Sequence, residues 1–195
     1  TVTASITTTE DVDTLKTLTE THAYTIVIAA GDATSSTAAE LTTINGATSL
    51  AVNASAITAL ASDNISNINT LLTAGNDTAQ FTSASFGSLT GVTVSDTTLN
   101  GATLASAVDQ ANSATGDTSV VFTITAADEI QGTEANFTAL LADEGNSQIS
   151  ITDQNLNVNS GTVSVANANL LSGTTSGTVT ASITTTEDVD TLKTL

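Results

Sequence analysis

The chain has 195 residues, of which 39% are hydrophobic, and its 20 acidic against 2 basic side chains give a formal net charge of −18. This charge excludes nucleic acid as an expected partner, because one polyanion repels another, whereas the apolar fraction is enough for a folded core. The absence of Cys excludes disulfides and thiol redox chemistry, and no apolar run is long enough to predict membrane insertion.

Short runs rich in β-branched residues predict β-strands, and several of these runs alternate between apolar and polar side chains. Val92-Thr93-Val94 and Ile149-Ser150-Ile151 are two such alternations. In chain order, the predicted strands are residues 2–6, 24–28, 50–54, 79–83, 92–95, 119–125, 148–152, 162–165 and 179–183.

Helical patterns lie between most of these strands. The first begins after Thr9, the expected N-cap, and places acidic side chains in its first turn, where the helix dipole favours them. The predicted helices are residues 9–18, 36–44, 62–72, 103–111, 133–142 and 166–171. A strand followed by a helix, repeated in this way, predicts parallel strands with helices on the outside.

The two ends of the chain are identical. Residues 1–18 read TVTASITTTEDVDTLKTL, and residues 178–195 repeat them without a change, 177 positions later. We therefore expect residues 1–177 to be one tandem-repeat unit of roughly six to eight strand-turn-helix coils. Residues 178–195 would then be the start of the next unit. Whether such an array is one polypeptide or is assembled from subunits stays open.

Two folds are compatible with these patterns. The first is a β-solenoid-like repeat with parallel strands and short helices on some coils, that is, a mixed α/β solenoid. The alternative is one compact α/β domain. The identical ends favour the solenoid, since residues 178–195 can then stack on the coil before them.

Residues 176–182 (SGTVTAS) and 92–99 (VTVSDTTL) are Thr-rich segments of the kind that Ala- and Leu-rich helical stretches follow. In this texture the chain resembles the Thr- and Ala-rich tandem repeats of very large secreted or cell-surface proteins of marine bacteria, cyanobacteria in particular. The resemblance implies an extracellular or cell-surface location and a structural role, and it carries over no functional residues.

We therefore expect a structural repeat of an extracellular filament, surface layer or adhesin stalk that performs no catalysis. Its expected partners are neighbouring copies of the same repeat, arranged end to end. The alternative is a calcium-dependent adhesive or carbohydrate-binding module.

No residue is predicted to be catalytic or to bind a cofactor. His22 is the only His, and its position between a helix and a strand predicts a surface role. The candidate metal ligands are the clustered acids Glu10, Asp11 and Asp13 and the pair Asp128 and Glu129, for which Ca²⁺ is the one ion considered. The alternative is that these acids lie at helix ends and face water.

Overall fold

The computed structural model describes residues 2–6, 10–83, 85–184 and 186–195. The helices in these residues are α1 (Val12–Leu15), the 3₁₀ helix η1 (Ala30–Asp32), α2 (Ala38–Gly46), α3 (Ile65–Gly75), α4 (Gly101–Thr115), α5 (Glu134–Gly145), α6 (Val165–Thr174) and α7 (Val189–Leu192). The strands are β1 (Thr3–Ser5), β2 (Ala23–Thr25), β3 (Ala59–Asp63), β4 (Gly91–Val94), β5 (Thr98–Asn100), β6 (Val121–Ile124), β7 (Glu129–Thr133), β8 (Asn155–Ser160) and β9 (Val179–Thr180). None of the described helices has the length and apolar character needed to cross a membrane.

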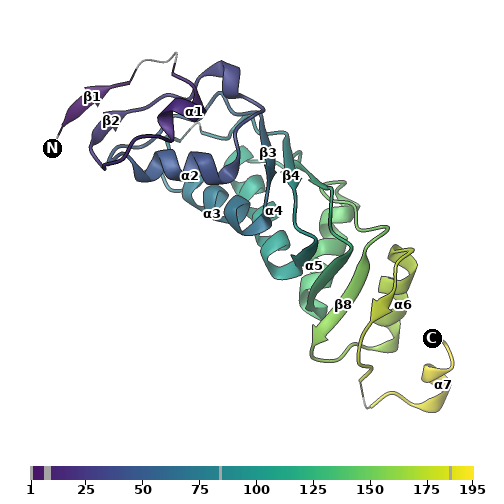
Figure 1. Cartoon of the computed structure of the whole chain (residues 1–195). Coiled ribbons are helices and arrows are strands. Elements are labelled where there is room, and N and C mark those ends of the chain that lie inside the picture. Colours follow the sequence, from purple (N-terminus) through teal and green to yellow (C-terminus); the bar gives the residue numbers. More distant parts are fainter. Residues whose placement is uncertain (1, 7–9, 84, 185) are drawn as a thin grey trace.

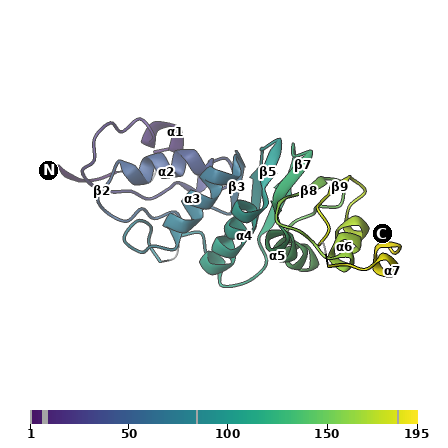
Figure 2. The ribbon, with the colours of Figure 1, turned by 90° about the horizontal axis from the view of Figure 1, so that it is seen from below.

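The strands of the described residues form three small sheets, and every strand pair is parallel. The sheet orders are β1-β2, β3-β4-β6 and β5-β7-β8-β9. Helices α2 to α5 lie side by side in chain order on one face, with the strands on the opposite face and the termini at opposite ends (Figures 1 and 2). The prediction of parallel strands covered by helices is therefore confirmed.

The predicted mixed α/β solenoid is wrong. A β-solenoid carries its strand pairing from coil to coil, whereas here the pairing is divided among three small sheets within an α/β fold. After β4 the chain leaves the sheet β3-β4-β6 and enters the sheet β5-β7-β8-β9 at β5. The chain makes the same change between β6 and β7. The structure thus agrees with the alternative, a compact α/β domain.

Four of the predicted strands differ from the structure. Residues 50–54 and 79–83 are joined only by an isolated bridge between Val52 and Phe81, and residues 162–165 also form only a bridge. Residues 148–152 are not in a strand. Conversely, the patterns did not predict β3, β5, β7 and β8, which contain Asp, Asn, Gln or Gly, residues of low strand propensity.

The helices begin where side chains cap them. Thr37 accepts a hydrogen bond from the backbone N–H of Glu40, and the Glu40 side chain accepts one from the backbone N–H of Thr37, which completes a capping box. Thr133 and Asn136 form the same arrangement at α5. The predicted N-cap Thr9 lies outside the described residues, and the N-cap of α1 is Asp11.

One buried apolar cluster runs between the helices and the strands, from Leu15 near one end to Leu171 near the other. Its largest pair is Phe81 and Phe86, whose ring centroids lie 5.2 Å apart. Gly75 ends α3 against this pair, since an added Cβ would lie 2.7 Å from the Phe86 ring. The core is therefore continuous although the sheets are not.

Candidate interaction site in the repeated terminal segments

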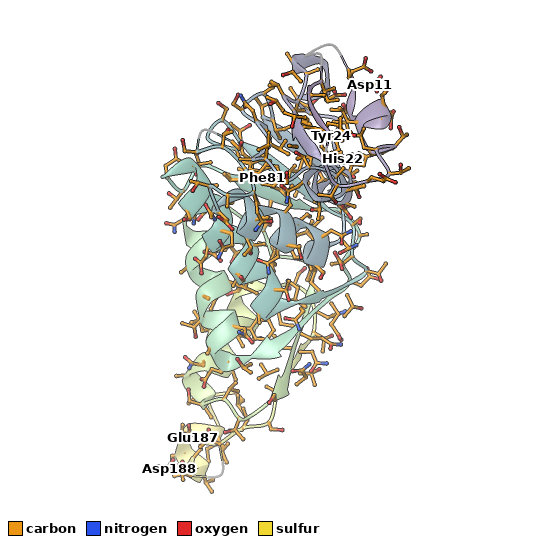
Figure 3. The ribbon with its side chains drawn as sticks, turned by 90° about the vertical axis from the view of Figure 1, so that its left-hand side faces the viewer. Asp11, His22, Tyr24, Phe81, Glu187 and Asp188 are labelled. Atoms are coloured by element: carbon orange, nitrogen blue, oxygen red, sulfur yellow. The ribbon has the colours of Figure 1, made fainter. Side chains whose placement is uncertain are left out.

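The two identical segments form the same short helix at opposite ends of the molecule, α1 in the first copy and α7 in the second. In Figure 3, Asp11 lies at one end, and Glu187 and Asp188 lie at the other. Asp11 and Asp188 occupy the same repeat position, and each caps its helix by accepting a hydrogen bond of 2.7 Å from a backbone N–H, that of Thr14 or of Thr191. These hydrogen bonds lower the pKa of both carboxyl groups. Differences between the two segments therefore come from their surroundings.

The first copy is covered by the residues that follow it, residues 19–46. Strand β1 pairs with β2, and the backbone N–H of Ile6 donates to the carbonyl of Thr25 over 3.0 Å. Helix α1 packs against α2 and buries Val12 and Leu15, which are 4% and 2% exposed.

Polar contacts fix the same side of the first copy. Lys16 Nζ lies 2.5 Å from Asp13 and 2.6 Å from Glu40 of α2, and these contacts raise the pKa of Lys16. The hydrogen bond from Lys16 lowers the pKa of Glu40. The backbone N–H of Val12 donates to Asp32 over 3.2 Å. We call the side formed by Val12, Leu15 and Lys16, and by their equivalents Val189, Leu192 and Lys193, the α2-facing side.

The second copy is covered by the residues that precede it. Strand β9 pairs with β8, and Ile183 forms a bridge with Val163. Glu187 accepts a hydrogen bond from the backbone N–H of Val165, at the start of α6, and the carbonyl of Thr194 accepts one from Asn169. The side formed by Ile183, Glu187 and Thr194, and by their equivalents Ile6, Glu10 and Thr17, is the α6-facing side.

Gly177 allows the second copy to approach so closely. A Cβ added to Gly177 would lie 2.4 Å from the backbone carbonyl oxygen of Gln154. Thr175 holds the same turn, because its hydroxyl donates to that carbonyl over 2.6 Å. Residue 177 is thus restricted to glycine by backbone contact.

The α2-facing side is buried in the first copy and exposed in the second. Val189 and Leu192 are 68% and 39% exposed, whereas the identical side chains of the first copy are buried. Among the described residues, the ion pair of Lys193 is to Asp190, within its own segment. A hollow of about 400 Å³ also opens on the first copy, lined by Ser5, Ile6, Glu10, Thr14, Leu15, Thr17 and Leu18. The two copies therefore differ in the burial of their α2-facing side.

The structure does not bring the candidate metal ligands into one group. Asp11 caps α1, Asp13 pairs with Lys16, and Glu10 lies just before them. Asp128 and Glu129 lie at the start of β7, where the Glu129 carboxylate accepts a hydrogen bond from Gln131. Within the described ranges, no group of three or more His, Cys, Asp or Glu side chains is placed to hold a metal ion.

His22 lies beside the first copy and is half-buried. Its Nδ1 accepts a hydrogen bond from the backbone N–H of Val2 over 3.4 Å, and its Nε2 lies 3.2 Å from Glu20. Its ring also meets the ring of Tyr24 edge to face, with centroids 5.5 Å apart. These contacts give His22 a role in holding the first copy on β2.

A separate pocket of about 590 Å³ lies beside β6, the last strand of its sheet. Glu144 and Asp153 line it with Phe122 and Gln154, and Gln154 Oε1 is buried without a hydrogen-bond partner in the described part of the chain. Nearby, burial and then the charge of Asp109 raise the pKa of Asp143 to about 6.

Sequence reasoning missed a set of carboxylates that cap the helix of the preceding segment. Asp63 accepts from the backbone N–H of Ala39 over 2.8 Å, and Asp96 accepts from that of Ile65 over 2.6 Å. Asp32 does the same for Val12 in α1. In the sequence, each of these acids is recognisable only as an Asp that follows a predicted helix. Its position does not indicate which backbone N–H it will bind.

A scan against protein-family models finds no match for the chain. Searches of the curated proteins and of the solved structures find none either.

Proposed function

We propose that this chain is a structural repeat of an extracellular filament, surface layer or adhesin stalk, that it performs no catalysis, and that its partners are neighbouring copies, end to end. The observation that supports this proposal most is the one-sided burial of the two identical terminal segments. Val12 and Leu15 are buried by α2, whereas the same side chains at Val189 and Leu192 face solvent. A following copy would offer the second segment the surface that already covers the first.

Composition supports the same role. The formal net charge of −18 disfavours nucleic acid and anionic lipid surfaces as partners. A chain without Cys needs no particular redox conditions to fold, which suits an extracellular array. A repeating unit with a contact at each end extends an array without a new interface for every addition.

Immunogold electron microscopy of intact source cells tests this function. An antibody against residues 19–177 is expected to label surface fibres or an outer layer, at a regular spacing set by the length of one unit. Pre-adsorption of the antibody with the purified chain is the control. Label confined to the cell interior would refute the extracellular structural role.

A second candidate, a calcium-dependent adhesive or carbohydrate-binding module, is supported by the pocket beside β6. This pocket combines two carboxylates, Glu144 and Asp153, with the buried Gln154 Oε1. Ligand binding to the folded state would raise the melting temperature. Thermal melts with Ca²⁺, with Mg²⁺ and with a chelator test it, and Asp153→Asn should remove a Ca²⁺-specific rise. An unchanged melting temperature in Ca²⁺ and in a glycan library would refute this function.

A further inference from the structure

The exposed apolar side chains of the second copy, Val189 and Leu192, belong to its α2-facing side. The surface that fits the α2-facing side belongs to residues 19–46, which the first copy already covers. The surface that fits the α6-facing side, around Val163 and Asn169, is covered by the second copy. Two copies of residues 1–195 can therefore join here only if one of these segments is first displaced.

We propose that residues 19–46 are a docking surface for residues 178–195 of another copy of this chain, and that residues 1–18 are the cover that keeps this surface closed. This inference rests on the proposed function, because it takes the partner at each end to be a second copy. The occupant follows from sequence identity, since the segment now seated on residues 19–46 and the segment proposed to replace it have the same 18 residues.

The contacts of the docked segment follow from those of the first copy. Val189 and Leu192 would take the places of Val12 and Leu15 beside α2. Lys193, whose ion pair in the described residues is with Asp190, would gain Glu40 of the second chain, as Lys16 has Glu40 in its own chain. These are the only two Lys or Arg residues in the sequence, so the ion pair can be assigned without ambiguity.

Exchange between two copies of residues 1–195 creates no net contact. Each joint would seat one copy of the segment on residues 19–46 and release the other, while two chains lose their independent motion. Residues 1–195 are therefore expected to stay monomeric. Joining becomes favourable when the first copy cannot hold its place, or when one continuous chain supplies a single copy at each joint.

The wild-type residues 1–195 and three variants with matched substitutions test this inference. Val12→Asp with Leu15→Asp should release the cover, leave the second copy intact and produce head-to-tail oligomers, an arrangement that does not close. Val189→Asp with Leu192→Asp, the same changes in the other copy, should stay monomeric like the wild type. The form with all four changes should also be monomeric, because its docking surface is open but its docking segment is broken.

Sedimentation equilibrium up to millimolar protein, at high salt to screen repulsion between the acidic chains, gives the readout. The first variant should show a weight-average mass about twice that of the wild type or more. A monomeric first variant, or equal association by the fourfold variant, would overturn the inference. Far-ultraviolet circular dichroism checks that the aspartate variants keep their helices. If they do not, Val12→Ala with Leu15→Ala serves as a milder release of the same cover.

Carbodiimide cross-linking provides a second readout. Non-specific aggregation is not expected to produce the specific cross-link that this interface predicts. In a mixture of ¹⁵N-labelled and unlabelled first variant, we expect a link between Lys193 of one chain and Glu40 of the other. The substitutions change the mass of the Lys16 peptide, so the two Lys sites are distinguishable. Absence of this link in the oligomers would refute the interface. Failure here leaves the microscopy result intact, whereas interior label refutes the cellular role and leaves this interface standing.

Discussion

The replacements Leu15→Ala and Leu192→Ala remove the same side chain from the same 18-residue sequence, at opposite ends of the molecule. Helix propensity and local neighbours are identical in the two cases, so any difference in effect reports tertiary packing alone. Leu15 is 2% exposed beneath α2, whereas Leu192 is 39% exposed. We therefore expect the replacement in the first copy to be the more damaging.

The magnitude follows from burial. Removing a buried Leu costs about 2–5 kcal/mol, and a site at the end of a molecule, beside an open hollow, can relax, which favours about 2–3 kcal/mol for Leu15. The partly exposed Leu192 should lose about 1 kcal/mol, because less of its apolar surface leaves water on folding. The difference of about 1–2 kcal/mol corresponds to about 3–6 °C in melting temperature for a chain of this length.

Native-state hydrogen exchange measures the effect locally, together with thermal melts. The backbone N–H of Lys16 donates to the carbonyl of Val12 over 3.0 Å, and that of Lys193 donates to Val189 over 3.2 Å. Both amides therefore report a hydrogen bond at the same repeat position. Leu15→Ala should speed exchange at Lys16 more than Leu192→Ala speeds it at Lys193. Equal losses in the two copies, or a larger loss at Leu192, would refute the assignment of the buried and open sides.

Three further predictions concern single sites. Gly177→Ala should lower the free energy of unfolding by about 1–3 kcal/mol, because the new Cβ meets backbone. Gly173→Ala places its Cβ where no other atom lies within 4 Å, so it should not lower this free energy. Chemical denaturation measures both variants. The folded pKa of Asp143, about 6, lies above its ordinary value of 3.8, so the stability that this group contributes is present below about pH 4 and is lost as pH rises through 6. Asp143→Asn should therefore be more stable than the wild type at pH 7.5 and equal to it near pH 4, and equal urea midpoints at both pH values would contradict this. Lys16→Met should lower the melting temperature by about 1–2 °C at low salt, and Lys193→Met should leave it unchanged.

The sequence was sufficient to predict helices α1 to α6 and the parallel pairing of the strands. The helices predicted at residues 36–44 and 133–142 correspond to α2 and α5, because Thr37 and Thr133 each stand three residues before a side chain that completes a capping box. Such signals depend only on neighbours in the chain, which is why they can be read without the fold.

The assignment of strands to sheets could not be predicted from neighbours in the chain. Strand β8 has the sequence NLNVNS, in which Asn alternates with Leu and Val, and Asn is uncommon in strands. It forms because Leu156 and Val158 are buried and because β7 and β9 pair with its two edges. The break between β4 and β5, which separates two sheets and contradicts the solenoid, likewise depends on neighbouring strands.

The acidic residues show the same limit at the candidate site. Position alone suggested calcium ligands at Glu10, Asp11 and Asp13, with helix-end acids as the alternative, and Asp11 is in fact an N-cap. The caps formed by Asp63 and Asp96 join segments 24 and 31 residues apart. Only the packing of consecutive helices places such carboxylates on the helix before them.

In the proposed array, the same packing would let so acidic a unit lie against another copy. Residues 1–177 carry 17 acidic side chains and one Lys. That Lys lies in the terminal segment, between Asp13 and the carboxylate of Glu40. The other acids of the contact, Asp11 and Asp32, are engaged by backbone N–H groups. At the proposed joint one Lys and two backbone N–H groups would thus engage these four carboxylates, and salt would screen the remaining surface charges beyond about 8 Å at physiological ionic strength. Repulsion between the proposed units would then act mainly on their approach, and the contacts at the joint would decide whether they stay together.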